Sequence, residues 1–281
     1  MLTEDFREIL FEKDDETGIV KITLNIPKRK NALSHLTFLE LFWAVDIMEN
    51  DDSATAMIIT GAKDPDNNDP AKEAFSSGGY FNMSALDGVE DDLKGQMDFQ
   101  DIAQKKLTMK FWQFDKPVIA AINGLAVGAG FTMPLAGADL IYMSEHAWLK
   151  LPFISLGIVP EFASTYLLPR LVGFQKAKEV MFFGESITAN EALELGLVNK
   201  VVKHEELLPY AKEAALKLVP PQGAGLAVRL TKRALHKTLI DNFSDALDLE
   251  NEGLNKAVTT SDFLEYLTAR GQKRAPVFKG E

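Results

Sequence analysis

The sequence contains no cysteine among its 281 residues. This absence excludes disulfide bonds, thiolate zinc sites and cysteine nucleophiles together. Histidine is scarce as well, because there are only four: His35, His146, His204 and His236. They are far apart in the sequence and no two stand at i, i+4, so their spacing gives no support for a metal site. Surface or hydrogen-bonded histidines are the interpretation that this pattern favours.

Long apolar runs are also missing. No stretch reaches the ~18 residues that a membrane-spanning helix requires. The first residues, "MLTEDFREILFEKDDETG", are acidic and lack the basic start and apolar core of a signal peptide. The last residues, "FKGE", are not a peroxisomal address. We therefore expect a cytoplasmic protein with no membrane partner.

Positive charge is in short supply. Lys and Arg number 30 against 41 Asp and Glu, which gives a net charge of −11 and a pI of about 5.0. Such a chain is a poor candidate for binding nucleic acid or an anionic membrane. An anionic ligand would need a local basic patch. Hydrophobic residues make up 46% of the chain, enough to bury a large core in one domain with a smaller appendage.

Strand-like and helix-like patterns alternate along the first 200 residues. Period-2 or short buried runs predict strands at 6–12, 18–25, 54–61, 116–124 and 139–145. Helical spacing predicts helices at 32–50, 100–114 and 128–138, the first with Ser34 as N-cap. This rhythm favours an α/β fold. From about residue 203 the pattern is helical, so we divide the chain into a core of residues 1–202 and a helical segment of residues 203–281.

Three nucleotide-binding or catalytic motifs are absent. The spacing G-x-G-x-x-G, counted from Gly128, would need glycine where Met133 stands. The chain has no Walker-type G-x-x-x-x-G-K-[ST] and no G-x-S-x-G nucleophile elbow. Nicotinamide-dependent, nucleotide-hydrolysing and serine-hydrolase functions are therefore poorly supported.

Two glycine turns follow strand-like segments, "SSGG" at 76–79 and "GAG" at 128–130. The second turn opens a predicted helix, where free N–H groups favour negative charge. Two such N–H groups converging on one carbonyl oxygen would form an oxyanion hole. The alternative is that both are ordinary tight turns.

Glu161 stands alone in the apolar stretch "LKLPFISLGIVPEFASTYLLPRL" at 149–171. An unpaired carboxylate is costly to bury, and desolvation makes it a stronger base. The residues by themselves favour a glutamate that caps or pairs at the start of a helix, since Pro-Glu is common in a first turn. A catalytic role is the other interpretation.

Several blocks together resemble the crotonase (enoyl-CoA hydratase/isomerase) superfamily. They are "IPKRKNAL", "AFSSGGYF", "KPVIAAINGLAVGAG", "LPFISLGIVPEFASTYLLPRLVG", "AKEVMFFGESITANEALELGLVNKVV" and "KRAPVFKGE", in the order of the family. The resemblance implies a crotonase-like spiral of βαβ units with a helical C-terminal trimerisation region, assembled as a homotrimer or hexamer. It also implies an acyl-CoA substrate whose thioester oxygen accepts from the backbone N–H groups of Gly79 and Ala129. One departure is Gly79-Tyr80, where the family often has Ala-Asp.

The resemblance also bears on the reaction. Hydratases of the family use two glutamates, and this chain has Thr132 and Phe153 at those positions, neither of which is an acid or a base at neutral pH. Glu161 matches the single glutamate of the Δ3,Δ2-enoyl-CoA isomerases, the branch with "PF…LG…PE…SY". That match implies proton transfer from C2 to C4 by one carboxyl group, with no metal or redox cofactor. Alternatives are hydration, thioester hydrolysis with Glu161 positioning a water, and a non-catalytic acyl-CoA binder.

The remaining candidates are expected to contact the substrate. Near the adenine end of coenzyme A we expect Lys28, Arg29, Lys30 and the backbone around Ala32; from a neighbouring subunit, Lys273, Arg274 and Lys279. Around the acyl tail we expect Phe81, Met83, Phe131, Phe153 and Phe162. Ser77, Tyr80 and Thr132 are further candidates for contact with the acyl-CoA substrate. A solvated surface is the alternative for the basic residues, and ordinary core is the alternative for the aromatic ones.

Overall fold

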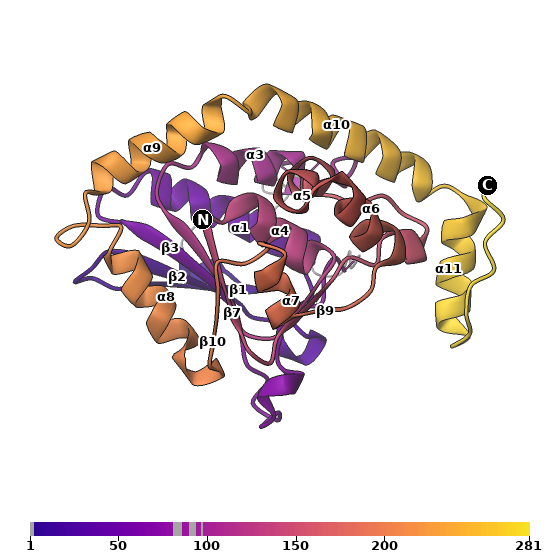
Figure 1. Ribbon diagram of the computed structural model, residues 1–281, viewed down its shortest axis with the longest axis horizontal. Coiled ribbons are helices and arrows are strands. Elements are labelled where there is room, and N and C mark those ends of the chain that lie inside the picture. Colours follow the sequence, from indigo (N-terminus) through magenta and orange to yellow (C-terminus); the bar gives the residue numbers. More distant parts are fainter. Residues whose placement is uncertain (1–2, 81–85, 90–93, 97) are drawn as a thin grey trace.

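The chain adopts the α/β architecture that the sequence predicts, in a computed structural model that describes residues 3–80, 86–89, 94–96 and 98–281 (Figure 1). Its larger sheet has the order β1-β2-β3-β5-β7-β10. The strands are β1 (Ile9–Lys13), β2 (Ile19–Leu24), β3 (Ala56–Gly61), β5 (Val118–Ile122), β7 (Leu140–Ser144) and β10 (Lys200–Val202). Only β1 and β2 pair antiparallel, and the other neighbours are parallel.

Both faces of this sheet are covered, because alternate side chains of its central strands enter two separate clusters. Ile58 of β3 and Ile119 of β5 pack against α8 (Leu207–Leu216). Ile59 of β3 and Ala120 of β5 belong to the larger cluster on the other face. All residues of β3 and β5 are buried, as expected of parallel strands between two layers of helices.

A smaller sheet carries the two glycine turns. Its order is β4 (Ala74–Ser76), β6 (Leu125–Val127), β8 (Trp148–Lys150) and β9 (Ile187–Thr188). The first three strands run parallel, and β9 is antiparallel to β8. Strands of two or three residues are too short to show a period, so the sequence does not predict this sheet.

The first long helix, α1 (His35–Glu49), begins where expected. The Oγ of Ser34 accepts from the N–H groups of Leu36 (3.1 Å) and Thr37 (3.3 Å), which confirms it as the N-cap. Short 3-10 turns lie at Thr3–Asp5, Pro27–Arg29, Pro70–Lys72, Ile154–Leu156 and His204–Glu206. The other helices are α3 (Lys105–Gln113), α4 (Ala129–Gly137), α5 (Ser164–Val172), α6 (Phe174–Phe183), α7 (Ala189–Glu194), α9 (Gly225–Lys237), α10 (Ile240–Ala257) and α11 (Ser261–Gly271).

The C-terminal helices lie against the core. In Figure 1, α9 and α10 arch over α3 and α5, and α11 stands at one end of the molecule. The ring of Trp112 on α3 stacks between His236 of α9 (centroids 4.0 Å apart) and Phe243 of α10 (3.9 Å). Residues 203–281 thus share packing with residues 1–202. Across the described ranges, every helix is too short or too polar to cross a bilayer.

Candidate functional site

The two glycine turns lie against each other. Strands β4 and β6, which precede them, pair in parallel with Ser76 opposite Ala126. Gly78 has a φ of +92°, and a Cβ there would lie 2.4 Å from the carbonyl oxygen of Val127 and 3.6 Å from the nitrogen of Ala129. The sequence positions of the turns are 50 residues apart, and the sheet brings them into contact.

Two N–H groups at this contact are free to bind a ligand. Within the described ranges, the N–H groups of Gly79 and Ala129 donate to no acceptor, whereas the next one along, that of Tyr80, donates to the carbonyl of Leu33 (2.8 Å). Gly79 is exposed, and a Cβ there would meet nothing within 4 Å. Ala129 is the first residue of α4, after Gly128 at φ +53° and ψ −125°. Both N–H groups can therefore donate to an oxygen outside the chain.

A pair of alanine substitutions tests this geometry. Gly78→Ala places a methyl group against the Val127 carbonyl at a φ that alanine disfavours, so we expect a loss of about 2 kcal/mol or more in unfolding free energy. Gly79→Ala meets open space and should leave stability within about 0.5 kcal/mol of wild type. Urea denaturation measures both. Equal stability of the two variants would contradict the proposed contact between the turns.

Glu161 lies in the turn that leads into α5. No hydrogen bond or ion pair involves its carboxyl group in the part of the chain that the structure describes. Although the residue as a whole is partly exposed, the protein atoms around its carboxyl group displace water, and this desolvation raises the pKa of Glu161 to about 8. The negative charge of Glu250 adds to the rise. A carboxyl without a partner, held in this way, is suited to exchange a proton with a ligand.

One interpretation of the sequence is that Glu161 caps the start of a helix. In the structure, Glu250 caps the start of α5 instead. Glu250, on α10, is 2% exposed. Its Oε2 accepts from the N–H of Ala163 (2.7 Å), and its Oε1 accepts from the N–H (2.9 Å) and the Oγ1 (2.6 Å) of Thr165. Burial raises the pKa of Glu250 to about 7 although these donors favour the ionised form. The capping interpretation of Glu161 is therefore wrong.

The backbone between Glu161 and α5 is strained. Phe162 (φ +58°) and Ala163 (φ +53°) are consecutive non-glycine residues in the left-handed region. Each costs roughly 1–2 kcal/mol. The N–H of Phe162 donates to Ala103 (3.4 Å) and the N–H of Ser164 to the carbonyl of Glu161 (3.1 Å). Contacts with elements remote in the sequence maintain this turn.

The aromatic residues expected around the acyl group are in the core. Phe131, Phe153 and Phe162 are at most 2% exposed and belong to one buried cluster with Ala129. The ring of Phe153 lies 3.8 Å from where a Cβ would stand on Gly128. These three rings are therefore core residues, and their contact with an acyl group stays a prediction.

Thr132 is also buried, and its Oγ1 donates to the carbonyl of Gly128 (3.3 Å). Its hydroxyl thus serves the first turn of α4. Phe81 and Met83, the other residues predicted near the acyl group, lie outside the described residues.

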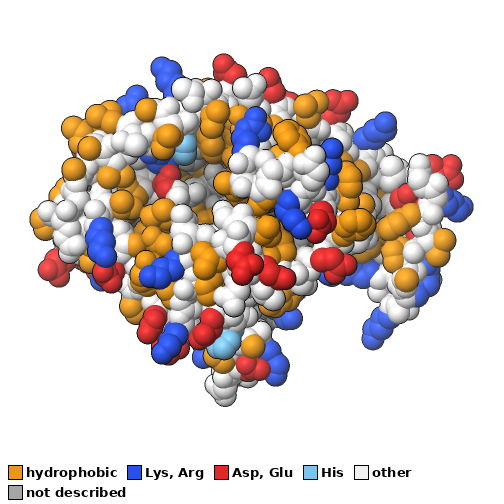
Figure 2. Space-filling view, in the orientation of Figure 1, with side chains coloured by type: hydrophobic (Ala, Val, Ile, Leu, Met, Phe, Trp, Pro, Cys, Tyr) orange, Lys and Arg blue, Asp and Glu red, His pale blue; other side chains and the backbone are white. Residues whose placement is uncertain are grey.

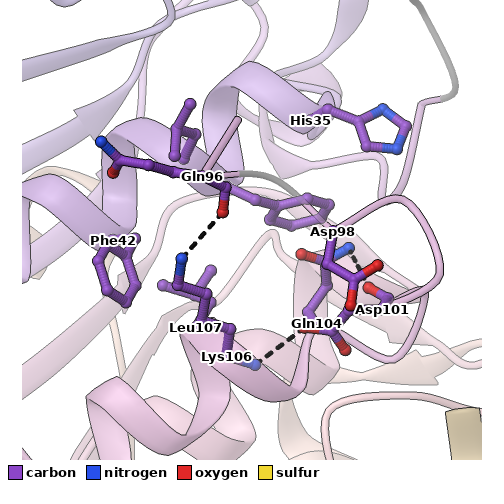
Figure 3. Close-up of a pocket in the computed structure, with 10 residues that line it drawn as sticks. His35, Phe42, Gln96, Asp98, Asp101, Gln104, Lys106 and Leu107 are labelled. Carbon is purple, nitrogen blue, oxygen red and sulfur yellow. Dashed lines mark hydrogen bonds between the residues drawn. The ribbon is translucent and has the colours of Figure 1, made fainter. Parts of the chain in front are cut away.

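A cavity lies between α1 and α3, one ring away from the Glu161 turn. Phe38, which lines it, packs against Phe162 with centroids 5.8 Å apart. Its lining combines apolar side chains (Phe38, Leu39, Phe42, Leu107) with polar ones (His35, Gln96, Asp98, Asp101, Gln104, Lys106). In Figure 3, Lys106 reaches Gln96, whose carbonyl accepts from its Nζ (2.9 Å). The cavity thus has an apolar wall and a polar rim.

The first basic cluster lies beside the Gly78 turn. The N–H of Ser77 donates to the carbonyl of Lys30 (2.8 Å), and the Oγ of Ser77 donates to the carbonyl of Arg29 (3.1 Å). Ala32 follows in the same strip and is 7% exposed. The guanidinium of Arg29 lies over the ring of Tyr80, 4.6 Å from its centroid. The structure therefore brings together these residues, which the sequence predicted to contact coenzyme A.

The cations of that strip differ in availability. Lys28 forms ion pairs with Asp64 (2.9 Å) and Asp66, so its charge is already neutralised. Lys30 is exposed and has no side-chain partner in the described ranges.

The second basic cluster lies in the last residues of the chain. Lys273, Arg274 and Lys279 follow α11, which Figure 1 shows at the far end of the molecule. Arg274 pairs with Glu265, and the N–H of Lys279 donates to Asp262 (2.6 Å). Contact with a neighbouring subunit's ligand stays a prediction for these residues.

Comparison with known proteins places the chain in a family. A family model described as enoyl-CoA hydratase/isomerase matches residues 14–281. The chain belongs to the enoyl-CoA hydratase/isomerase family. A short-chain-enoyl-CoA hydratase of Clostridium acetobutylicum is 34% identical over 271 residues, covering 96% of this chain and 97% of that protein. A 1,2-epoxyphenylacetyl-CoA isomerase of Escherichia coli K12 is 30% identical over 268 residues, covering 95% and 97%.

Solved structures agree with this assignment. The crystal structure of an enoyl-CoA hydratase/isomerase from Pseudoalteromonas atlantica T6c has a TM-score of 0.82 at 25% identity, covering 97% of this chain and 100% of that one. The crotonase resemblance and fold are thereby confirmed, and the chain is an acyl-CoA-processing enzyme of this family. The names of the relatives include both hydratases and an isomerase, so the comparisons do not single out the isomerase branch.

The sequence analysis missed Glu250, although the sequence carried a signal. Phe243, Leu247, Glu250 and Leu254 are the buried residues of α10, at the spacing of a single apolar stripe. A glutamate at a core position of such a stripe is unusual and indicates a buried polar contact.

Proposed function

We propose that this enzyme shifts the double bond of a 3-enoyl-CoA to give the 2-enoyl-CoA. In this proposal Glu161 is the single acid/base and the N–H groups of Gly79 and Ala129 form the oxyanion hole. The observation that carries it is the isolated carboxyl group of Glu161, which has no hydrogen-bond partner in the described ranges and a pKa raised to about 8.

The reaction needs one proton acceptor and one oxyanion site. The ionised carboxylate of Glu161 takes a proton from C2, and the electrons of the C–H bond form the enolate of the thioester. The two N–H groups donate to the enolate oxygen and stabilise its charge. The carboxyl group of Glu161 then returns its proton to C4, and the double bond comes to rest between C2 and C3. Atoms and charge balance without a metal or redox group.

The environment of Glu161 suits this role. Desolvation makes its carboxylate a stronger base than one in water, which favours removal of a weakly acidic C2 proton. The neighbouring residue Phe162 is buried in the apolar core, which keeps the surroundings of Glu161 poor in water.

Coenzyme A would lie along the strip formed by residues 29–33 and 77–80. Lys30 is exposed there, and the ring of Tyr80 lies beside it with Arg29 above. The Lys28 ion pairs would have to open before Lys28 contacts a phosphate. The cavity between α1 and α3 is separated from Phe162 by the ring of Phe38 and is a candidate for the end of the acyl chain if that ring moves aside.

Hydration is the second candidate, and the names of the curated relatives favour it over isomerisation. Thr132 and Phe153 argue against it, because neither side chain can activate or orient a water. Glu161 would then have to act on the water alone. Thioester hydrolysis and non-catalytic acyl-CoA binding remain the further alternatives.

Product analysis decides among these functions. We expect incubation with a 3-enoyl-CoA to give a product of unchanged mass that absorbs as a conjugated thioester. Hydration would instead add one water to a 2-enoyl-CoA, and hydrolysis would release free coenzyme A. Mass spectrometry and thioester absorbance, measured against a heat-inactivated sample, report all three. Failure to change any of these substrates would leave only the binding role.

The assembly and location of the enzyme also stay predictions. Exposed apolar side chains on α6 and α9, including Phe174, Phe183, Leu226 and Leu235, support self-association into a homotrimer or hexamer. Figure 2 shows hydrophobic side chains between acidic and basic ones on this face of the molecule.

A further inference from the structure

We propose that Glu250 is a positioning residue for Glu161: its carboxylate holds the strained turn that presents Glu161, and its negative charge acts directly on the Glu161 carboxyl group. The inference rests on the proposed function, in which Glu161 is the acid/base. It gives the C-terminal helix α10 a part in the reaction, although that helix supplies no group that touches the substrate.

The positioning rests on three hydrogen bonds. Two N–H groups and one hydroxyl, all within four residues of Glu161, converge on the two oxygens of Glu250 at 2.6–2.9 Å. One of the donors is the N–H of Ala163, a residue in the left-handed region. Charge-assisted hydrogen bonds to a buried carboxylate are strong and directional. Without them the turn can relax to an ordinary conformation and take Glu161 with it.

Further contacts from α10 also hold the turn that presents Glu161. The Oδ1 of Asn251 accepts from the N–H of Ala103 (3.2 Å), whose carbonyl accepts from Phe162. Gly253 faces Val159, and a Cβ on Gly253 would lie 3.0 Å from that side chain. Glu250 and Gly253 of α10 thus contact residues that flank Glu161, and Asn251 binds Ala103, whose carbonyl accepts from the neighbouring Phe162.

The charge of Glu250 is the other half of the argument. Two carboxyl groups that share an apolar site resist simultaneous ionisation. The other charged side chains of the elements packed against the turn are Asp98 and Asp101 of the loop before α3, Lys105, Lys106 and Lys110 of α3, Arg170 of α5, and Asp241, Asp245, Asp248, Glu252 and Lys256 of α10. Lys105 and Asp248 neutralise each other at 2.6 Å, and Arg170 lies over the ring of Tyr166 at 3.4 Å. Of the described titratable groups, Glu250 is the one whose charge acts on Glu161.

The test compares Glu250→Gln with wild type in two measurements. Infrared difference spectroscopy follows the C=O band of protonated Glu161, which is assigned by its loss in Glu161→Gln. Removal of the negative charge of Glu250 should move the pH at which half of this band is lost (its midpoint) to a value lower by about half a unit or more. With a 3-enoyl-CoA, kcat should fall about 10-fold with KM little changed, because an amide can satisfy only part of the three donors.

Two further variants distinguish the positioning of Glu161 by Glu250 from a general loss of protein stability. Asp245→Asn removes an exposed carboxylate from the same helix and should change neither measurement. Thr165→Val removes one of the three donors, keeps the charge, and should lower kcat while moving the band less than Glu250→Gln does. Thr165 is exposed, so Thr165→Val tests the hydrogen bonds to Glu250 even if Glu250→Gln fails to fold.

The outcomes are distinct. An unchanged band midpoint in Glu250→Gln, or full activity in both Glu250→Gln and Thr165→Val, overturns the inference. Another outcome is that the band midpoint shifts in Glu250→Gln while the wild-type enzyme does not isomerise a 3-enoyl-CoA. That result supports the coupling of the two carboxyl groups and refutes the proposed function instead.

Discussion

Replacement of Glu161 by glutamine should lower kcat for isomerisation of a 3-enoyl-CoA by about 10³-fold or more. Glutamine has nearly the same shape but cannot accept the C2 proton, and the described residues around the turn offer no second base with a free carboxyl group. The absorbance of the conjugated thioester measures the rate. KM should change little, because the N–H groups of Gly79 and Ala129 do not depend on the side chain at 161.

The melting temperature of Glu161→Gln shows whether its loss of activity comes from unfolding. The pKa of Glu161 in the folded protein, about 8, lies above the ordinary value of 4.5. The folded state therefore loses stability as the pH rises from about 4.5 through 8, since the charged form is the one that folding disfavours. Glu161→Gln has no charge to bury and should melt at a higher temperature than wild type at pH 8–9. Equal turnover by a stably folded Glu161→Gln would end the isomerase proposal.

The pH dependence of wild-type kcat/KM should show an acid limb with an apparent pKa near 8. Glu161 acts as a base, so it must be ionised, and burial with the nearby charge of Glu250 raises its pKa to about 8. Below that value the ionised fraction falls tenfold per pH unit, which makes kcat/KM at pH 6 about 100-fold lower than the plateau. Initial rates between pH 5.5 and 9.5 measure the profile.

A carboxylate with an ordinary pKa would give a different profile. The rate would already be constant above about pH 5.5. A flat profile between pH 6 and 8 would therefore contradict the raised pKa of Glu161, whatever the product of the reaction. Glu179, an exposed glutamate paired with Lys176, offers a neutral substitution, because Glu179→Gln should leave the profile unchanged.

Much of this arrangement could be predicted from the sequence. The buried strands and the capped helix α1 follow from hydrophobic periodicity and from Ser34. The two glycine turns and the carboxyl group at 161 stand out because their neighbours are apolar or small. The helix predicted at 100–114 is shorter and spans Lys105–Gln113. The N–H of Ala103 donates to Asn251 of α10 and the N–H of Lys105 donates to the carboxylate of Asp101, so the residues before Lys105 form other hydrogen bonds than those of a helix.

Other features could not be predicted in this way. The rings of Phe131, Phe153 and Phe162 have the composition of an acyl-binding slot and of a core alike, and only packing assigns them to the core. The Lys28 charge looks available in the sequence, but Asp64 and Asp66 from a loop 36 and 38 residues away neutralise it.

The sequence by itself determined which groups are capable of the chemistry: one carboxyl group in an apolar segment, and two glycine turns with N–H groups to spare. Local patterns encode these because they depend only on neighbouring residues. The tertiary structure decided how the groups meet, through the pairing of β4 with β6 and through Glu250, 87 residues from Ala163. Contacts between segments so far apart arise from the packing of whole elements, which no local pattern records.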